Sequence, residues 1–112
     1  MTVAEFKRDG ATYEANITGH AGYNPGQDIV CAACSSLAYT LLNAAMKAAD
    51  SGELSEASYK EDDGALLVRV RAKDHAADRI DAIWETIAGG YAILAERYPD
   101  NVAVKYSTSQ TG

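Results

Sequence analysis

The sequence predicts an α+β fold, an antiparallel or mixed sheet of about five strands with two helices packed on it. Short runs of alternating or β-prone residues predict the strands, and Asp-Gly pairs predict turns between neighbouring strands. Two longer runs repeat apolar residues at steps of three and four, the spacing of one helix face. Their order along the chain is ββαββαβ, which suits helices layered on a single sheet.

The N-terminal segment is expected to form a β-hairpin. Residues 3–8 alternate in character, the Asp9-Gly10 pair favours a tight turn, and residues 12–18 are β-prone. Residues 19–27 contain three glycines, an asparagine and a proline. Because that composition breaks regular structure, we expect a mobile loop there.

A long helix is expected to follow this loop. Asp28 suits the N-cap, because its carboxylate can accept hydrogen bonds from backbone N–H groups near Val30 and Cys31. The helix extends to about Asp50 and ends at Ser51-Gly52. One apolar stripe is expected to face the sheet and consists of Val30, Cys34, Leu37, Leu41 and Ala45.

The second half of the chain repeats the order strand, strand, helix. Residues 58–60 and 65–72 are expected to pair as a hairpin around Asp62-Asp63-Gly64. A second helix begins at Asp74 or Asp78. Its apolar stripe comprises Ile80, Ile83, Trp84, Ile87, Tyr91, Leu94 and Tyr98.

The second helix leads into the last strand. Gly89-Gly90 inside the helix indicates that another backbone, from the sheet or from a dimer partner, approaches closely. Pro99 ends the helix, and residues 102–106 alternate as a strand. We therefore expect one domain over residues 1–106 and a disordered tail over residues 107–112.

Composition and charge restrict the class of protein. The chain has 112 residues, 47% of them hydrophobic, enough for one domain whose core needs no disulfide or metal. The net charge of −6 argues against nucleic acid as a direct ligand and favours a basic partner. No run approaches the roughly 18 consecutive apolar residues of a membrane helix, and the N-terminus lacks a hydrophobic signal region. We therefore expect a cytoplasmic protein without membrane contact.

Cys31 and His20 are the residues that indicate chemistry. Cys31 falls at about the third helical position, where the helix dipole and free backbone N–H groups favour a thiolate and can hold an oxyanion. His20 lies at the start of the glycine-rich loop, which can fold back and bring the imidazole to the thiol. The two would then form a Cys-His dyad. The alternative is an inert packing cysteine and a solvated surface histidine.

Cys31 and Cys34 also form a C-x-x-C pair at a helix start, the arrangement of thiol-disulfide oxidoreductases. Such folds commonly place a cis-proline opposite the thiols, and neither proline here lies between two strand runs. A zinc site would need His20, both cysteines and His75, and it lacks a second closely spaced ligand pair. We therefore expect no metal, and we expect His75 to be solvated.

Two polar residues next to the dyad each allow two interpretations. Asp28 is either a plain N-cap or a carboxylate that orients His20. Ser35 lies one turn after Cys31, and it is either a hydrogen-bond partner of the site or a serine bonded to its own helix backbone.

Gly19-His20-Ala21, the segment 28–33 that reads Asp-Ile-Val-Cys-Ala-Ala, and Ser35 together closely resemble the Prp family of ribosomal-processing cysteine proteases. The resemblance implies a strand-rich domain with two helices. It also implies a cysteine endopeptidase that removes a short N-terminal extension from a large-subunit ribosomal protein. The expected partners are that precursor as substrate and a second copy of the chain in a homodimer.

The resemblance also implies roles for individual residues. Cys31 matches the nucleophile and His20 its general base, with Asp28 and Ser35 at supporting positions and no cofactor. The loop between histidine and cysteine is implied to order around the substrate, and its candidate contact residues are Gly22, Tyr23, Asn24 and Gly26.

Cys34 departs from the family pattern, which usually has a small non-thiol residue there. The helix stripe places Cys34 toward the core, which favours packing over redox chemistry. Two alternatives stay open: a C-x-x-C oxidoreductase, and a non-catalytic module that binds ribosome-assembly factors.

Overall fold

The computed structural model describes residues 1–24 and 26–110 and confirms the α+β order ββαββαβ. Its strands are β1 (Thr2–Asp9), β2 (Thr12–Thr18), β3 (Leu54–Asp62), β4 (Ala65–Ala72) and β5 (Val102–Ser109). Its helices are α1 (Ile29–Asp50), a short 3₁₀ turn η1 (Asp74–Ala76) and α2 (Ala77–Arg97).

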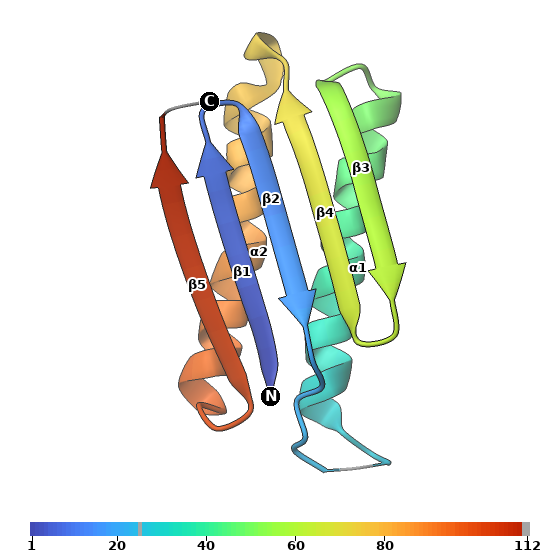
Figure 1. Cartoon of the computed structure of the whole chain (residues 1–112), viewed down its shortest axis with the longest axis vertical. Coiled ribbons are helices and arrows are strands. Elements are labelled where there is room, and N and C mark those ends of the chain that lie inside the picture. Colours follow the sequence, from blue (N-terminus) through green and yellow to red (C-terminus); the bar gives the residue numbers. More distant parts are fainter. Residues whose placement is uncertain (25, 111–112) are drawn as a thin grey trace.

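The five strands form one mixed sheet in the order β3-β4-β2-β1-β5. Neighbouring strands are antiparallel except β1 and β5, which run parallel. Figure 1 shows both helices on the same side of the sheet. The end of β2, the start of α1 and the β3–β4 turn all lie at one end of the molecule, and η1 lies at the other.

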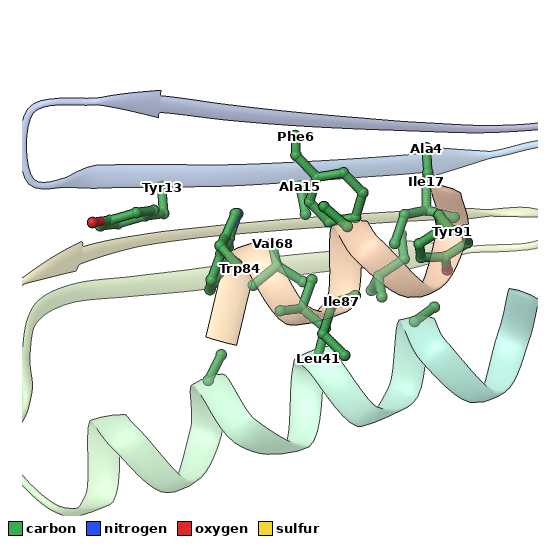
Figure 2. Packing of buried hydrophobic residues seen from close by; sticks show 14 of the residues in the cluster. Ala4, Phe6, Tyr13, Ala15, Ile17, Leu41, Val68, Trp84, Ile87 and Tyr91 are labelled. Atoms are coloured by element: carbon green, nitrogen blue, oxygen red, sulfur yellow. The ribbon is translucent and has the colours of Figure 1, made fainter. Parts of the chain in front are cut away.

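The core lies between the sheet and the two helices (Figure 2). Trp84 and Tyr91 of α2 are among its largest members, and both have a polar tip that burial would leave unpaired. Trp84 Nε1 donates to the Glu14 carbonyl at 3.0 Å, and the Tyr91 hydroxyl donates to the Cys34 carbonyl at 2.7 Å. Each aromatic therefore fixes the helix to a second element by packing and by a hydrogen bond.

Trp84 gives a direct test of this packing. It is 1% exposed, and its ring centroid lies 5.6 Å from that of Tyr13 on β2. We expect Trp84→Ala to lower the free energy of unfolding by about 3–5 kcal/mol, because it leaves a cavity and removes the hydrogen bond to the Glu14 carbonyl. The exposed neighbour Glu85 supplies the control: Glu85→Ala should change stability by less than about 0.5 kcal/mol. Urea unfolding followed by circular dichroism measures both, and equal losses would contradict the packing.

The predicted apolar stripe of α1 is buried at Val30, Cys34, Leu41 and Ala45, and Leu37 is partly buried. Leu37 explains why residue 90 is a glycine, because a β-carbon at that position would lie 2.8 Å from Leu37 Cδ2. The neighbour there is thus a side chain of α1, and not the backbone that the sequence suggested.

By length and composition, α1 would pass as a membrane-spanning helix. Core helices of globular proteins share those properties, and the buried residues of α1 recur along one face. Packing in the core accounts for the apolar residues on that face, whereas other apolar side chains of α1 stay exposed.

Three element boundaries differ from the predicted ones. β3 starts at Leu54 and not at residue 58. The sequence pattern missed this start because every residue after Leu54 is exposed, so the strand shows no apolar alternation. α2 starts at Ala77, after a separate 3₁₀ turn that begins at Asp74. β5 continues to Ser109, where its backbone pairs with β1, so residues 107–109 are not a disordered tail. Residues 111–112 of that tail lie outside the described residues.

Candidate active site

A cavity of about 520 Å³ opens where β2 ends and α1 begins. It brings together three of the predicted site residues, His20, Cys31 and Ser35. The rest of its lining comes from the chain start, the end of β2, α1 and the β3–β4 hairpin: Thr2, Ile17, Gly19, Cys34, Ala38, Tyr39, Glu61, Asp62, Asp63, Gly64, Ala65 and Leu66.

Cys31 is the third residue of α1, as the sequence predicts, and is partly exposed to this cavity. Asp28 is the N-cap, and its Oδ1 accepts a hydrogen bond from the Cys31 backbone N–H at 2.8 Å. The positive end of the helix dipole therefore lies at the thiol, where it favours the thiolate. Because Asp28 accepts the Cys31 N–H, as predicted for the N-cap, that particular group is not free to hold an oxyanion.

The second oxygen of Asp28 binds the loop. Oδ2 accepts the backbone N–H of Tyr23 at 2.8 Å and that of Asn24 at 3.4 Å. The hydrogen bond from the Cys31 N–H is the main cause that lowers the pKa of Asp28, and those from the loop add to it. Backbone groups thus engage both oxygens, which supports the N-cap interpretation.

The lowered pKa of Asp28 predicts how stability depends on pH. A carboxylate with a depressed folded pKa contributes stability above its unfolded pKa, and that contribution is lost as pH falls through the folded value. We expect Asp28→Ala to lower the melting temperature by about 3–6 °C at pH 7 and by less below about pH 3. Asp28→Asn keeps a good N-cap and should lose less. Scanning calorimetry at both pH values measures this, and an equal loss at both would contradict it.

His20 follows the end of β2 and is held against the β3–β4 turn. The Gly19 N–H donates to the Gly64 carbonyl at 2.8 Å, which joins the two segments. The imidazole lies over Gly64 so closely that a β-carbon there would come within 2.9 Å of His20 Nε2. The residue exposes its ring to the cavity and solvent.

Cys34 belongs to the core, as the stripe of α1 predicts, with 4% of its surface exposed. Burial raises the pKa of its thiol. The hydroxyl of Thr2 is buried as well, and it has no hydrogen-bond partner among the described residues. A buried, protonated thiol is a poor partner for dithiol exchange, which disfavours the oxidoreductase alternative.

The predicted contact residues of the loop, Gly22, Tyr23, Asn24 and Gly26, lie outside the lining of the cavity. The loop contacts the segment that follows α2. The Asn101 side chain donates to the Ala21 carbonyl at 3.0 Å, and the Tyr23 ring meets Tyr98 edge-on at 5.3 Å. The loop therefore borders the site, and its role toward a substrate stays a prediction.

Sequence reasoning missed the acidic wall of the cavity. Glu61, Asp62 and Asp63 come from the β3–β4 hairpin, which the sequence identified only as a turn. Tyr39 on α1 donates its hydroxyl to Glu61, and this bond raises the pKa of the tyrosine. The pairing of β4 with β2 brings the hairpin to the end of β2. No local sequence pattern predicts such a distant contact.

The structure does not assemble the four residues of the zinc alternative. His75 lies in η1 and does not line the cavity that holds His20, Cys31 and Cys34. Within residues 1–24 and 26–110, no group of three or more His, Cys, Asp or Glu side chains is placed to hold a metal ion.

Comparison with known proteins supplies the family. A family model described as cysteine protease Prp matches residues 1–103. The crystal structure of SMU.848 from Streptococcus mutans is 30% identical with a TM-score of 0.68, covering 97% of this chain and 96% of that one. The ribosomal processing protease Prp from Staphylococcus aureus, crystallised with a covalently linked product peptide, is 24% identical with a TM-score of 0.72, covering 95% and 99%. No curated protein gives a significant match.

Proposed function

The chain belongs to the cysteine protease Prp family, and we propose that it is an endopeptidase with Cys31 as nucleophile and His20 as general base. One observation carries the assignment of the dyad: the two residues come from different elements, yet they line the same cavity. Cys31 also has the helix N-terminus that favours a thiolate, and His20 is held at the cavity wall by the Gly19–Gly64 contact.

The first half of the proposed reaction forms a thioester. His20 removes the proton from Cys31 as the sulfur attacks the carbonyl carbon of the scissile peptide bond, and the electron pair of the carbonyl moves to its oxygen. When the oxyanion collapses, the carbon–nitrogen bond breaks, and the imidazolium of His20 gives its proton to the leaving amine. The N-terminal fragment of the substrate stays bound to Cys31.

The second half releases this fragment. His20 removes a proton from water, and the resulting hydroxide attacks the thioester carbon. Collapse of this second oxyanion breaks the carbon–sulfur bond, and the imidazolium returns a proton to Cys31. The product leaves with a new carboxyl group. Asp28 supports the reaction by fixing the start of α1, and Ser35 lines the cavity within one turn of the nucleophile.

We propose that the substrate is a large-subunit ribosomal protein precursor that loses a short N-terminal extension. The Staphylococcus aureus relative is a ribosomal processing protease, crystallised with a substrate peptide and with a covalently linked product. A covalent product fits a nucleophilic mechanism. Ribosomal proteins are basic, and the net charge of −6 here complements a basic partner.

The remaining features of the proposal are a single protease domain, a cytoplasmic location and a homodimer. Large apolar side chains on α1 stay exposed in one copy: Ile29 at 64%, Tyr39 at 56% and Met46 at 49%. A second copy of the chain would cover such side chains. Light scattering after size-exclusion chromatography tests the dimer, and a monomer at micromolar concentration would contradict it.

The test of the proposed function is mass spectrometry of the host's precursor after incubation with the protein under reducing conditions. We expect one new N-terminus, at the end of the extension. Prior treatment of the protein with iodoacetamide should prevent the cut, and a precursor made without its extension should stay intact. An intact precursor after incubation with folded, reduced protein would reject the protease, and dithiol titration would then examine the oxidoreductase alternative.

A further inference from the structure

The acidic β3–β4 hairpin forms a wall of the proposed active site. Glu61 ends β3 with Asp62, and Asp63-Gly64 forms the turn into β4. The turn contacts the segment of His20 through the Gly19–Gly64 hydrogen bond and through the imidazole that lies over Gly64. Its carboxylates therefore stand beside the proposed general base, at the end of the molecule where α1 begins (Figure 1).

The charge of this wall is not balanced within the cavity. The lining contains three carboxylates, those of Glu61, Asp62 and Asp63, and no lysine or arginine. The four ion pairs of the described residues use other carboxylates: Glu5, Glu14, Glu53 and Asp81. Tyr39 donates a neutral hydrogen bond to Glu61, which orients that carboxylate without neutralising it.

The floor of the same cavity carries a second feature that a ligand would complete. The Thr2 side chain is 2% exposed and lines the cavity, and its hydroxyl has no hydrogen-bond partner among the described residues. A buried hydroxyl is normally paired. An unpaired one at the floor, below an acidic wall, indicates a site that is incomplete until a polar ligand fills it.

We propose that Glu61, Asp62 and Asp63 form a specificity subsite for a cationic side chain, lysine or arginine, of the peptide bound in this cavity. This inference rests on the proposed function. A cationic side chain on the substrate would supply the charge that the cavity lacks, and clefts lined by one sign of charge attract the opposite sign. Because the carboxylates are exposed, salt should screen the preference.

The experiment measures kcat/KM for a set of fluorogenic peptides that span the host's cleavage junction. In each peptide one lysine is replaced by norleucine, or one arginine by citrulline, so that only charge is lost. We expect one replacement to lower kcat/KM about tenfold at low salt and about twofold at 0.5 M KCl. If no replacement has an effect, or the effect is equal at both salt concentrations, the proposal is overturned.

Two variants of the protein test whether the hairpin carboxylates cause the preference for a cationic side chain. In the variant Glu61→Gln, Asp62→Asn, Asp63→Asn, the turn becomes Asn-Gly, which favours the same hairpin. The matched control, Asp74→Asn, Asp78→Asn, Glu85→Gln, removes three exposed carboxylates from η1 and α2, outside the cavity lining. We expect the hairpin variant to lose the preference for the cationic peptide and the control to keep it. Equal behaviour of the two variants would overturn the proposal.

A binding measurement separates this inference from the proposed function. Fluorescence anisotropy of labelled peptides on Cys31→Ala should show the same preference for the cationic peptide without any cleavage. If wild type cleaves the peptides without charge preference, only the subsite is rejected. If wild type cleaves none of them, the proposed function is rejected together with the subsite.

Discussion

Replacing Cys31 with alanine should abolish cleavage of the precursor, whereas replacing Cys34 with alanine should keep the rate within about threefold of wild type. Cys31 lies at the N-terminus of α1, partly exposed to the cavity, and alanine there removes the atom that forms the thioester. We expect a loss of at least about 10⁴-fold, which in practice is no detectable product.

Cys34 should differ because its sulfur is part of the core. It is 4% exposed, and burial raises the pKa of its thiol, so the reactive thiolate is disfavoured. Its substitution by alanine removes packing, and we expect a loss of about 1 kcal/mol in the free energy of unfolding.

Mass spectrometry of the precursor under reducing conditions, with both variants at equal concentration, separates the three functional alternatives. Cleavage lost only in Cys31→Ala supports the protease. Equal loss in both variants would instead favour a dithiol enzyme, since that chemistry needs both sulfurs. If no variant and no wild type cleaves the precursor, and Cys31→Ala still supports function in cells, the protein would be a non-catalytic binding module.

The sequence predicted most of the fold because the elements around the core carry strong local patterns. The stripe of α1 and the alternation of β4 each follow from one face being buried. The N-cap Asp28 follows from the backbone N–H groups that the start of a helix leaves unpaired. β3 lacked that pattern, since it is exposed along nearly its whole length and owes its form to pairing with β4.

The site was predictable only where its residues lie close together in sequence. Asp28 and Cys31 are one helical turn apart, so the geometry of their contact follows from the helix itself. The acidic wall reaches the cavity through the pairing of β4 with β2, two strands far apart along the chain, and a single sequence holds no local trace of that pairing. The contact between Gly64 and His20 also depends on this distant pairing, so the sequence did not predict it.

Gly64 gives the second large effect, because it leaves the space that the imidazole of His20 occupies. A β-carbon at Gly64 would come within 2.9 Å of Nε2, and the Gly64 φ of +71° already disfavours any other residue. We expect Gly64→Ala to lower kcat about 10- to 100-fold, since displacing a catalytic group by about 1 Å is enough for such a loss. Gly64 would thus act as a positioning residue for His20.

Gly52 provides the matched control for this prediction. Its φ is +74°, close to that of Gly64, but a β-carbon there would meet nothing within 4 Å. Both alanine variants should therefore lose a similar amount of stability, about 1–2 kcal/mol, from the left-handed backbone. Only Gly64→Ala should lose kcat, with KM nearly unchanged, because the imidazole moves while the rest of the cavity stays in place. If the two variants lose kcat equally, the effect comes from backbone strain, and the contact between Gly64 and His20 has no part in catalysis.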